Sequence, residues 1–233
     1  MNRIESNRIE SNRIKSCENQ IYVTNSFFFI QILWDNRLLG DIGIPQKITT
    51  DGTDFRVMQQ PNQRGYYSFK FRGPAMRYEL GIGIQSGYIV WASRGYKAGA
   101  NPDITIFRKG GLKDLLLEAG EKTVADLGYR GEPELIDVPN EGSADYRVQM
   151  AYARARHETC NKRLKNFNCL KERFRHSIDY HNVCFDAVLV VTQLSLQNGE
   201  PLFDVEFSGE QEVDSDESSE DDESSDDESN DSD

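Results

Sequence analysis

The sequence predicts an α/β domain with a mixed sheet and helices on its faces. Segments rich in β-branched and aromatic residues, separated by Gly-containing turns, occupy much of the first half of the chain. Helical patterns follow, so that the order is strands, a short helix, a strand and a long helix. This order is typical of a sheet covered by helices, and 233 residues are enough for one sizeable core or two small ones.

Strands are expected in four segments of the first half, namely KITTDGTDFRVM, YYSFKF, MRYELGIGI and GYIVWAS. The last three are typical of an antiparallel meander. In the first segment, β-branched residues lead to Asp51 and Gly52, which predicts a strand that ends in an acidic turn. A later short β-type segment, Thr123 to Ala125, is followed by Asp126 and then by another Gly-containing turn. Two carboxylates are therefore expected at strand ends.

Helices are expected in four segments. Residues 101–120 begin with a cap-like Asn-Pro-Asp and contain a leucine run interrupted by two glycines. Residues 153–176 predict a long helix, and residues 185–197 predict a mostly buried one. Residues 21–34 are apolar, but fourteen residues are too few to span a bilayer and the start of the chain lacks a signal-peptide pattern. A core or interface helix is the favoured interpretation, with no membrane partner.

The charge divides the chain into segments. Residues 208–233 hold fourteen of the 39 acidic residues and none of the 27 basic ones, so the net charge of −12 describes a strongly acidic tail on a weakly basic body. The tail is predicted to be disordered and suited to binding basic proteins such as histones. Residues 1–20 contain a low-complexity repeat, residues 21–40 form a helical lead-in, and residues 41–207 form the folded domain.

The four cysteines form no CxxC pair, which favours reduced thiols in the cytosol or nucleus. A tetrahedral zinc site is conceivable because histidines and cysteines follow one another late in the chain. Its candidate ligands are His157, Cys160, Cys169, His176, His181 and Cys184. Their spacing matches no compact zinc motif, so buried cysteines and surface histidines are the favoured interpretation.

A third carboxylate, Glu158, lies in the predicted helix 153–176. If the strands before Asp51 and Asp126 are neighbours and the helix packs across them, the three carboxylates converge at one sheet edge. Mg²⁺ prefers oxygen ligands, and two such ions about 3.5–4 Å apart can activate a water for phosphodiester cleavage. Unrelated surface carboxylates are the alternative interpretation, because the body contains many acidic residues.

Five motifs resemble, in order and spacing, the catalytic domain of PIF/Harbinger-like DDE-type transposases. They are TTDGTDF, NPDITIF, VADLGYRGE, ARARHETCNKRLKNF and NGEPLFDVEF, and the resemblance covers roughly residues 30–207. It implies an RNase H-like fold and a nuclear, Mg²⁺- or Mn²⁺-dependent endonuclease that hydrolyses DNA phosphodiester bonds. It also implies that Asp51, Asp126 and Glu158 are the catalytic acids, with Asp103 as an alternative ligand or a supporting group.

The chain departs from the family pattern at two places. Leu127 follows the second acid where many members have a small residue, and residues 1–40 stand where members carry a helical DNA-binding segment. The alternative is therefore a catalytically inactive, truncated or domesticated derivative that acts as a nuclear interaction module. The sequence does not predict an oligomeric state.

Cations surround Glu158 on the predicted helix. Arg154, Lys162 and Lys165 fall at i−4, i+4 and i+7 from Glu158, so they share its face and could hold a phosphate backbone. A solvated helix face is the alternative. The opposite side is expected to pack through Ala153, Cys160, Leu164, Phe167 and Phe174. Arg156 and Arg163 interrupt that side, and only snorkelling is expected of them.

Overall fold

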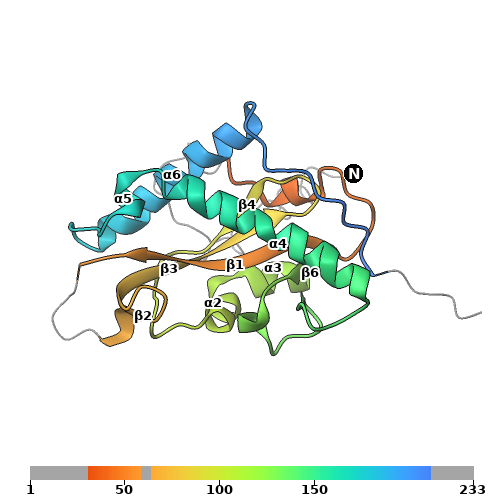
Figure 1. Cartoon of the computed structure of the whole chain (residues 1–233), viewed down its shortest axis with the longest axis horizontal. Coiled ribbons are helices and arrows are strands. Elements are labelled where there is room, and N and C mark those ends of the chain that lie inside the picture. Colours follow the sequence, from red (N-terminus) through yellow and green to blue (C-terminus); the bar gives the residue numbers. More distant parts are fainter. Residues whose placement is uncertain (1–30, 59–63, 211–233) are drawn as a thin grey trace, which may run out of the picture.

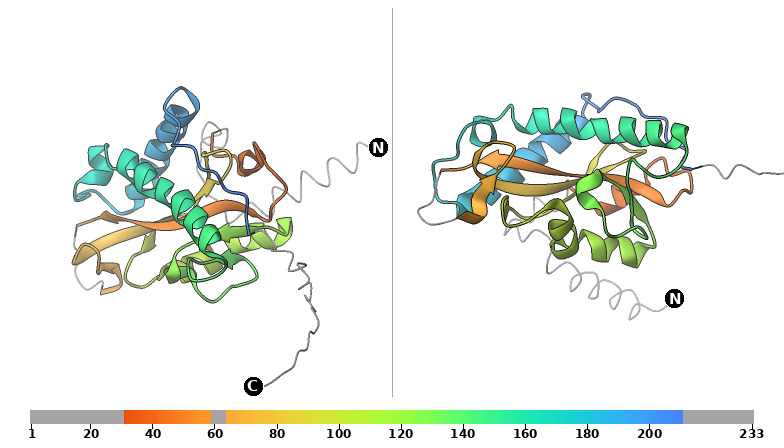
Figure 2. Two further views of the ribbon diagram at one scale, coloured as in Figure 1. Left: turned by 45° about the vertical axis from the view of Figure 1, so that its right-hand side comes forward. Right: turned by 60° about the horizontal axis from the view of Figure 1, so that its bottom comes forward.

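The computed structural model describes residues 31–58 and 64–210, and within them an open mixed sheet is flanked by helices (Figure 1). Helices α4, α5 and α6 cover one face of the sheet, and α2 and α3 cover the other (Figure 2). The predicted α/β class is confirmed. The N-terminal repeat, residues 21–30 of the predicted lead-in helix and the tail beyond residue 210 lie outside the described residues. The described half of the lead-in, residues 31–40, contains a short 3-10 turn at Trp34–Leu38.

Seven strands form the sheet, namely β1 (Gln46–Arg56), β2 (Tyr67–Ser68), β3 (Gly73–Gly83), β4 (Ile89–Ala92), β5 (Tyr96–Lys97), β6 (Lys122–Val124) and β7 (Ile136–Asp137). Strand β3 pairs antiparallel with β1 and also with β2, β4 and β5. Strand β6 lies parallel to the start of β1, and β7 lies parallel to β6. The predicted antiparallel meander is confirmed, although only Tyr67 and Ser68 of the YYSFKF segment are extended.

The predicted turn at Asp51 is wrong, because β1 continues through Asp51 and Gly52 to Arg56. Gly52 pairs with Glu79 of β3 in regular antiparallel register. A Cβ atom at Gly52 would collide with the Oδ1 atom of Asp103, so the glycine marks a close approach of another element rather than a turn. Sequence alone does not distinguish these two uses of glycine within a strand.

The helices are α2 (Asp103–Gly110), α3 (Leu112–Ala119), α4 (Ala144–Leu164), α5 (Asn168–Lys171) and α6 (Asp179–Gln197), with short 3-10 turns η3 (Trp34–Leu38), η4 (Arg64–Tyr66) and η5 (Leu127–Tyr129). The predicted glycine break is confirmed, since Gly111 adopts a φ of 103° between α2 and α3. Helix α6 contains all of the predicted helix 185–197.

The predicted helix 153–176 has the wrong bounds. Helix α4 begins earlier, where the Ser143 hydroxyl accepts a hydrogen bond from the Tyr146 amide and caps the helix. It ends at Leu164, so that the chain turns before α5. Phe167, expected to pack, is 37% exposed, whereas Phe174 is buried and bridges to Val57 at the end of β1.

Arg156 and Arg163 bind the C-terminal segment rather than snorkelling. Arg156 is 3% exposed, and it donates hydrogen bonds to the carbonyls of Phe203 (2.8 Å) and Ile84 (2.5 Å). Arg163 donates to the carbonyls of Glu200 and Pro201. The two guanidinium groups thereby fix the segment that follows α6 against α4. Within the part of the chain that the structure describes, no helix is long and apolar enough to cross a membrane.

Candidate metal and nucleic-acid site

Asp51 and Asp126 lie on neighbouring parallel strands. Thr49 of β1 pairs with Val124 of β6, so the same register, extended by two residues, places Asp51 beside Asp126. The Asp126 side chain accepts a hydrogen bond from the Gly128 amide (2.8 Å), which holds the carboxylate at the start of η5. The negative charge of Asp126 raises the pKa of Asp51. The strands before Asp51 and Asp126 are neighbours, which meets the first condition for the carboxylates to converge.

The Asp51 carboxyl is half-buried among other charges. Burial raises its pKa to about 6, and the negative charges of Asp126 and Asp103 contribute to the same shift. Lys70 and Arg154 oppose it. Near neutral pH this carboxylate is ionised but poorly solvated and repelled by its neighbours, a situation that a bound cation relieves.

Asp103, at the start of α2, approaches on the face of β1 to which Gly52 points, opposite to the face of Asp51, and its negative charge still acts on Asp51. We call Asp51, Asp103 and Asp126 the carboxylate cluster. Its carboxylate fits between two glycines, because a Cβ at Gly128 would lie 3.2 Å from Asp103 Oδ2 and a Cβ at Gly52 would collide with Oδ1. Asp103 Oδ1 lies 3.2 Å from Arg77 Nη1 but without hydrogen-bond geometry, so this buried oxygen has no hydrogen-bond partner among the described residues. Burial raises the pKa of Asp103 despite Arg77.

Helix α4 crosses the face of the sheet to which Asp51 points. The Nε2 atom of His157 lies 2.9 Å from the Thr49 hydroxyl, and alternate residues of a strand share a face, so Asp51 faces α4 as Thr49 does. Glu158, the next residue of α4, is exposed and makes no hydrogen bond or ion pair within the described residues. These residues contain no ready-made group of three His, Cys, Asp or Glu side chains that could hold a metal ion. Asp51, Asp103 and Asp126 thus interact electrostatically, while Glu158 stays outside the cluster.

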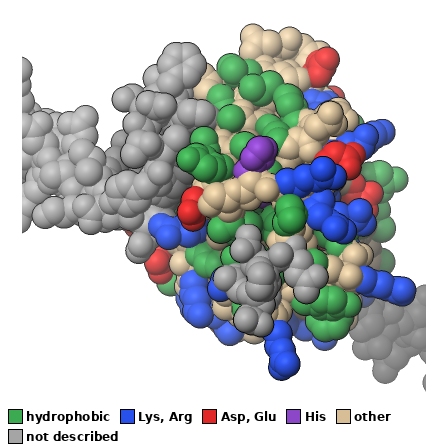
Figure 3. All heavy atoms as spheres, turned by 90° about the vertical axis from the view of Figure 1, so that its left-hand side faces the viewer, with side chains coloured by type: hydrophobic (Ala, Val, Ile, Leu, Met, Phe, Trp, Pro, Cys, Tyr) green, Lys and Arg blue, Asp and Glu red, His purple; other side chains and the backbone are tan. Residues whose placement is uncertain are grey.

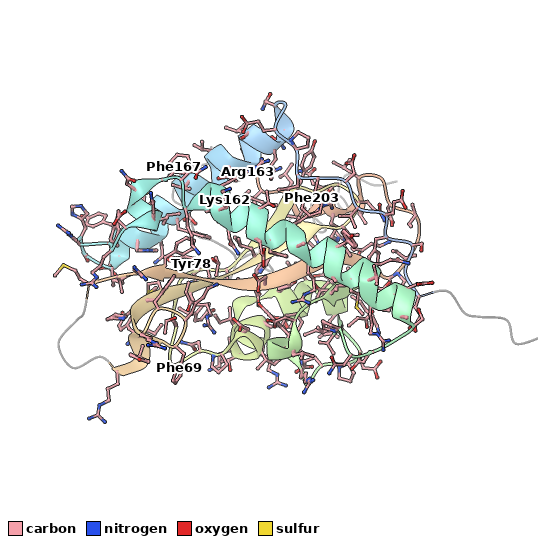
Figure 4. The ribbon with its side chains drawn as sticks, viewed as in Figure 1. Phe69, Tyr78, Lys162, Arg163, Phe167 and Phe203 are labelled. Carbon is pink, nitrogen blue, oxygen red and sulfur yellow. The ribbon has the colours of Figure 1, made fainter. Side chains whose placement is uncertain are left out.

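Two of the three predicted phosphate-binding cations approach the carboxylates. The positive charge of Arg154 opposes the rise in the pKa of Asp51. The negative charges of Asp54 and Asp51 oppose the fall in the pKa of Lys165. Burial, followed by the positive charge of Lys70, lowers the pKa of Lys165. Lys162 is exposed farther along α4 (Figure 4). Lys70 was missed because its segment was interpreted as an ordinary strand.

Arg77 neutralises the acidic side chains on the other face of β1. It donates to Asp54 Oδ1 (2.6 Å) and Oδ2 (3.1 Å), and the Ser68 hydroxyl donates to Asp54 Oδ2 (2.6 Å). Asp54 is only 2% exposed, so this arginine is its main source of compensation. Because Arg77 also pairs with Asp103, it connects the buried Asp54 to the carboxylate cluster.

Glu79 lies beneath this cluster and was not predicted from sequence. It is fully buried, the Trp91 indole N–H donates to its Oε1 (3.2 Å), and Oε2 has no hydrogen-bond partner among the described residues. Burial raises the pKa of Glu79 to about 8, so the carboxyl is largely protonated at neutral pH. The sequence around Glu79, Tyr-Glu-Leu, does not indicate this burial, because a polar residue between two apolar ones also fits a strand with one face exposed to solvent.

Glu79→Gln is expected to flatten the pH dependence of stability. The folded-state pKa of Glu79 is about 8 and its ordinary value is 4.5, so the folded state binds more protons in this range and loses stability as pH rises through it. The slope for one group is at most about 1.4 kcal/mol per pH unit. Urea unfolding at pH 5, 7 and 9 should show that the free energy of unfolding of Glu79→Gln increases relative to wild type as pH rises. The exposed control Glu118→Gln should show no such increase. Parallel curves for wild type and Glu79→Gln would contradict this assignment.

Two of the three histidines considered as zinc ligands, His157 and His181, occupy separate places in the core, so the interpretation as surface histidines is wrong for them and holds only for the exposed His176. His157 contacts Thr49, as described above, whereas His181 Nδ1 lies 2.7 Å from the Tyr78 hydroxyl. Burial lowers the pKa of both histidines to about 4, so both rings are neutral at physiological pH. Each ring therefore has a hydrogen-bonding role within the fold.

Comparisons of the chain with protein-family models, curated proteins and solved structures found no match. The resemblance to DDE transposases therefore depends on the five sequence motifs. The positions of the carboxylates in the fold are a separate line of argument, because they follow from strand register and packing.

Proposed function

We propose that this chain is a metal-dependent DNA endonuclease of the DDE transposase type with an RNase H-like fold. The observation that carries the proposal is the charge interaction between Asp51 in β1 and Asp126, which lies two residues beyond the parallel neighbour β6. Helix α4, which bears Glu158 and several cations, packs over β1 beside them. An RNase H-like sheet combines three antiparallel strands with two parallel ones. The order of β4, β3, β1, β6 and β7, with these directions, supports that assignment.

The carboxylates fit a hard divalent cation. Asp51, Asp103 and Asp126 supply oxygen ligands of the kind that Mg²⁺ and Mn²⁺ prefer. The buried Oδ1 of Asp103 is ion-paired with Arg77 but accepts no hydrogen bond from the described residues. Glu158 is the proposed third acid, and its exposed side chain would give up no hydrogen bond or ion pair with residues 31–58 or 64–210 on turning toward the cluster. A bound ion would polarise the phosphate and lower the pKa of the attacking water.

The surrounding cations hold the DNA backbone in this proposal. Arg154 lies on α4, Lys165 directly follows it, and Lys70 lies in the turn between β2 and β3; the charges of all three interact with Asp51. These three charges can position a phosphate against the carboxylates, and Lys162 can contact the backbone farther away. We place the protein in the nucleus, where its DNA substrate is found, and assign to the acidic tail the binding of basic proteins.

One observation favours a non-enzymatic alternative. Glu158 lies outside the carboxylate cluster, and the described residues form no complete metal-binding group. An inactive transposase derivative that binds DNA or nuclear proteins would retain the fold and the basic residues without cleaving DNA. The two functions differ in one measurable property, which is metal-dependent strand cleavage.

Glu158→Gln is expected to lose strand cleavage while retaining DNA binding. Wild type should nick supercoiled plasmid in Mg²⁺ or Mn²⁺ but not in EDTA, and the variant should nick at least about a hundredfold more slowly, equivalent to about 2.7 kcal/mol of transition-state stabilisation. Glu172→Gln is the matched control, because Glu172 is also an exposed carboxylate and follows α5. Equal nicking by Glu158→Gln and wild type would reject the assigned role of Glu158.

A further inference from the structure

The turn between β2 and β3 presents an unusually exposed aromatic side chain. Phe69 is 87% exposed, and Figure 4 places it at the outer margin of the hairpin, whereas Tyr78 lies inside the fold. The ring of Tyr67, itself 45% exposed, packs edge-on against Phe69 with centroids 5.4 Å apart. The two rings form an apolar surface that is almost fully exposed at Phe69 and about half exposed at Tyr67.

Several contacts fix this hairpin next to the carboxylates. The Ser68 hydroxyl binds Asp54 on β1. The ring of Phe71 lies under the Arg56 guanidinium (4.7 Å) and 5.9 Å from the ammonium group of Lys165. Arg72 completes the turn with a φ of 50°, a conformation that L-residues adopt infrequently. These contacts hold the turn that carries Phe69 in a fixed position on the fold.

The same hairpin carries positive charge toward the proposed cleavage site. Lys70, adjacent to Phe69, is exposed, and its positive charge acts on Lys165, whose ammonium group lies 5.9 Å from the Phe71 ring of the same hairpin. Arg72, within the turn, and Arg56, at the end of β1, are also exposed. Figure 3, which views this end of the molecule, shows more Lys and Arg than Asp and Glu side chains on the visible surface.

Building on the proposed function, we propose that residues 67–72 bind unpaired nucleotides of the DNA substrate beside the bond to be cleaved. Phe69 stacks on one exposed base, and Lys70 holds the phosphate next to that base. Aromatic side chains bind bases through their faces without hydrogen-bond readout. Bases inside a duplex are already stacked on each other, so an exposed ring beside phosphate-binding cations discriminates in favour of unpaired nucleotides.

Equilibrium binding by fluorescence anisotropy tests this selectivity. The full chain is titrated in metal-free buffer against a fully paired duplex and against the same duplex with a three-nucleotide single-stranded gap. Wild type is expected to prefer the gapped DNA. Phe69→Ala should reduce binding to gapped DNA by about 5- to 100-fold, the range measured for loss of one base–aromatic stack, and leave duplex binding within about twofold. Phe69→Trp should retain the preference.

Two further variants separate stacking from charge and from general surface effects. Lys70→Ala should weaken binding to both DNAs similarly, because phosphate contacts do not depend on base pairing. Tyr152→Ala should match wild type, since Tyr152 is an exposed aromatic residue on the part of α4 near the C-terminal segment. An unchanged preference for gapped DNA in Phe69→Ala, or no such preference in wild type, overturns the inference.

Plasmid nicking measured on the same preparations distinguishes failure of this inference from failure of the proposed function. Wild type that nicks plasmid but shows no preference for gapped DNA would retain the nuclease assignment and reject the stacking role of Phe69. A preference that depends on Phe69 in a protein without nicking activity would support the hairpin site and reject the nuclease assignment.

Discussion

Asp51→Asn is expected to abolish metal-dependent nicking, with a loss of at least about a thousandfold, or about 4 kcal/mol of transition-state stabilisation. Asp51 is the carboxylate on which the charges of Asp126, Asp103, Lys70 and Arg154 all act, so it lies at the centre of the cluster. An amide of the same shape removes the charge that binds a cation. Plasmid nicking in Mg²⁺ measures the effect, and wild-type activity in this variant would exclude catalysis at the cluster.

The same substitution should stabilise the protein in the absence of metal. The folded-state pKa of Asp51, about 6, lies above its ordinary value of 3.8, so ionisation costs folding free energy that grows from pH 4 to 6 and stays constant above. At pH 8 the gain in Asp51→Asn is on the order of 2–3 kcal/mol. Thermal unfolding in EDTA at pH 8 and pH 4 provides the comparison, because the gain should vanish at pH 4. If Asp51→Asn is less stable than wild type at pH 8, the unfavourable burial of the Asp51 charge and its repulsion by Asp126 and Asp103 are contradicted.

Arg77→Met is expected to lower the free energy of unfolding by about 3–5 kcal/mol. The substitution leaves Asp54, which is 2% exposed, without its bidentate partner and removes the compensating charge near Asp103. Breaking a buried ion pair costs this much because one charge remains buried and uncompensated. Urea unfolding followed by circular dichroism measures the change.

Two controls identify the cause of that loss. Lys113→Met removes a cation paired with Glu132 near the surface, where such pairs contribute less than about 1 kcal/mol, so its effect should be small. The double variant Asp54→Asn/Arg77→Met should recover part of the lost stability, because no buried carboxylate is left without a partner. If the double variant is no more stable than Arg77→Met, lost packing rather than uncompensated charge explains the effect.

The fold class could be predicted because hydrophobic periodicity determines the type and order of secondary structure. The meander and the glycine break between α2 and α3 follow from local sequence signals. The continuation of β1 through Gly52 could not, because it is made by pairing with β3, and the close approach that accounts for the glycine comes from Asp103, which lies far away in the sequence. The bounds of α4 were misjudged because the Ser143 cap precedes the Arg-rich motif that drew attention to the helix.

The candidate site was predictable only where its residues belong to local sequence motifs. Asp51 belongs to the motif TTDGTDF and Asp126 to VADLGYRGE. The parallel pairing of β1 with β6 brings these two motifs together. Asp103 was held as an alternative, and the structure places it against Gly128 in the same cluster. Lys70 and Glu79 were missed, because their relevance arises from tertiary packing around the site rather than from a local pattern.

The central claim is that the Asp51, Asp103 and Asp126 carboxylates bind a divalent cation, and direct Mn²⁺ binding tests it most directly. Electron paramagnetic resonance of free Mn²⁺, titrated with the full chain at pH 8, measures uptake without requiring DNA or activity. The acidic tail can also bind Mn²⁺, so the informative quantity is the difference between wild type and variants that retain the tail. Wild type should hold at least one Mn²⁺ that Asp51→Asn and Asp126→Asn both lose, whereas the exposed control Glu118→Gln keeps it. Identical Mn²⁺ uptake by wild type, Asp51→Asn and Asp126→Asn would contradict the claim.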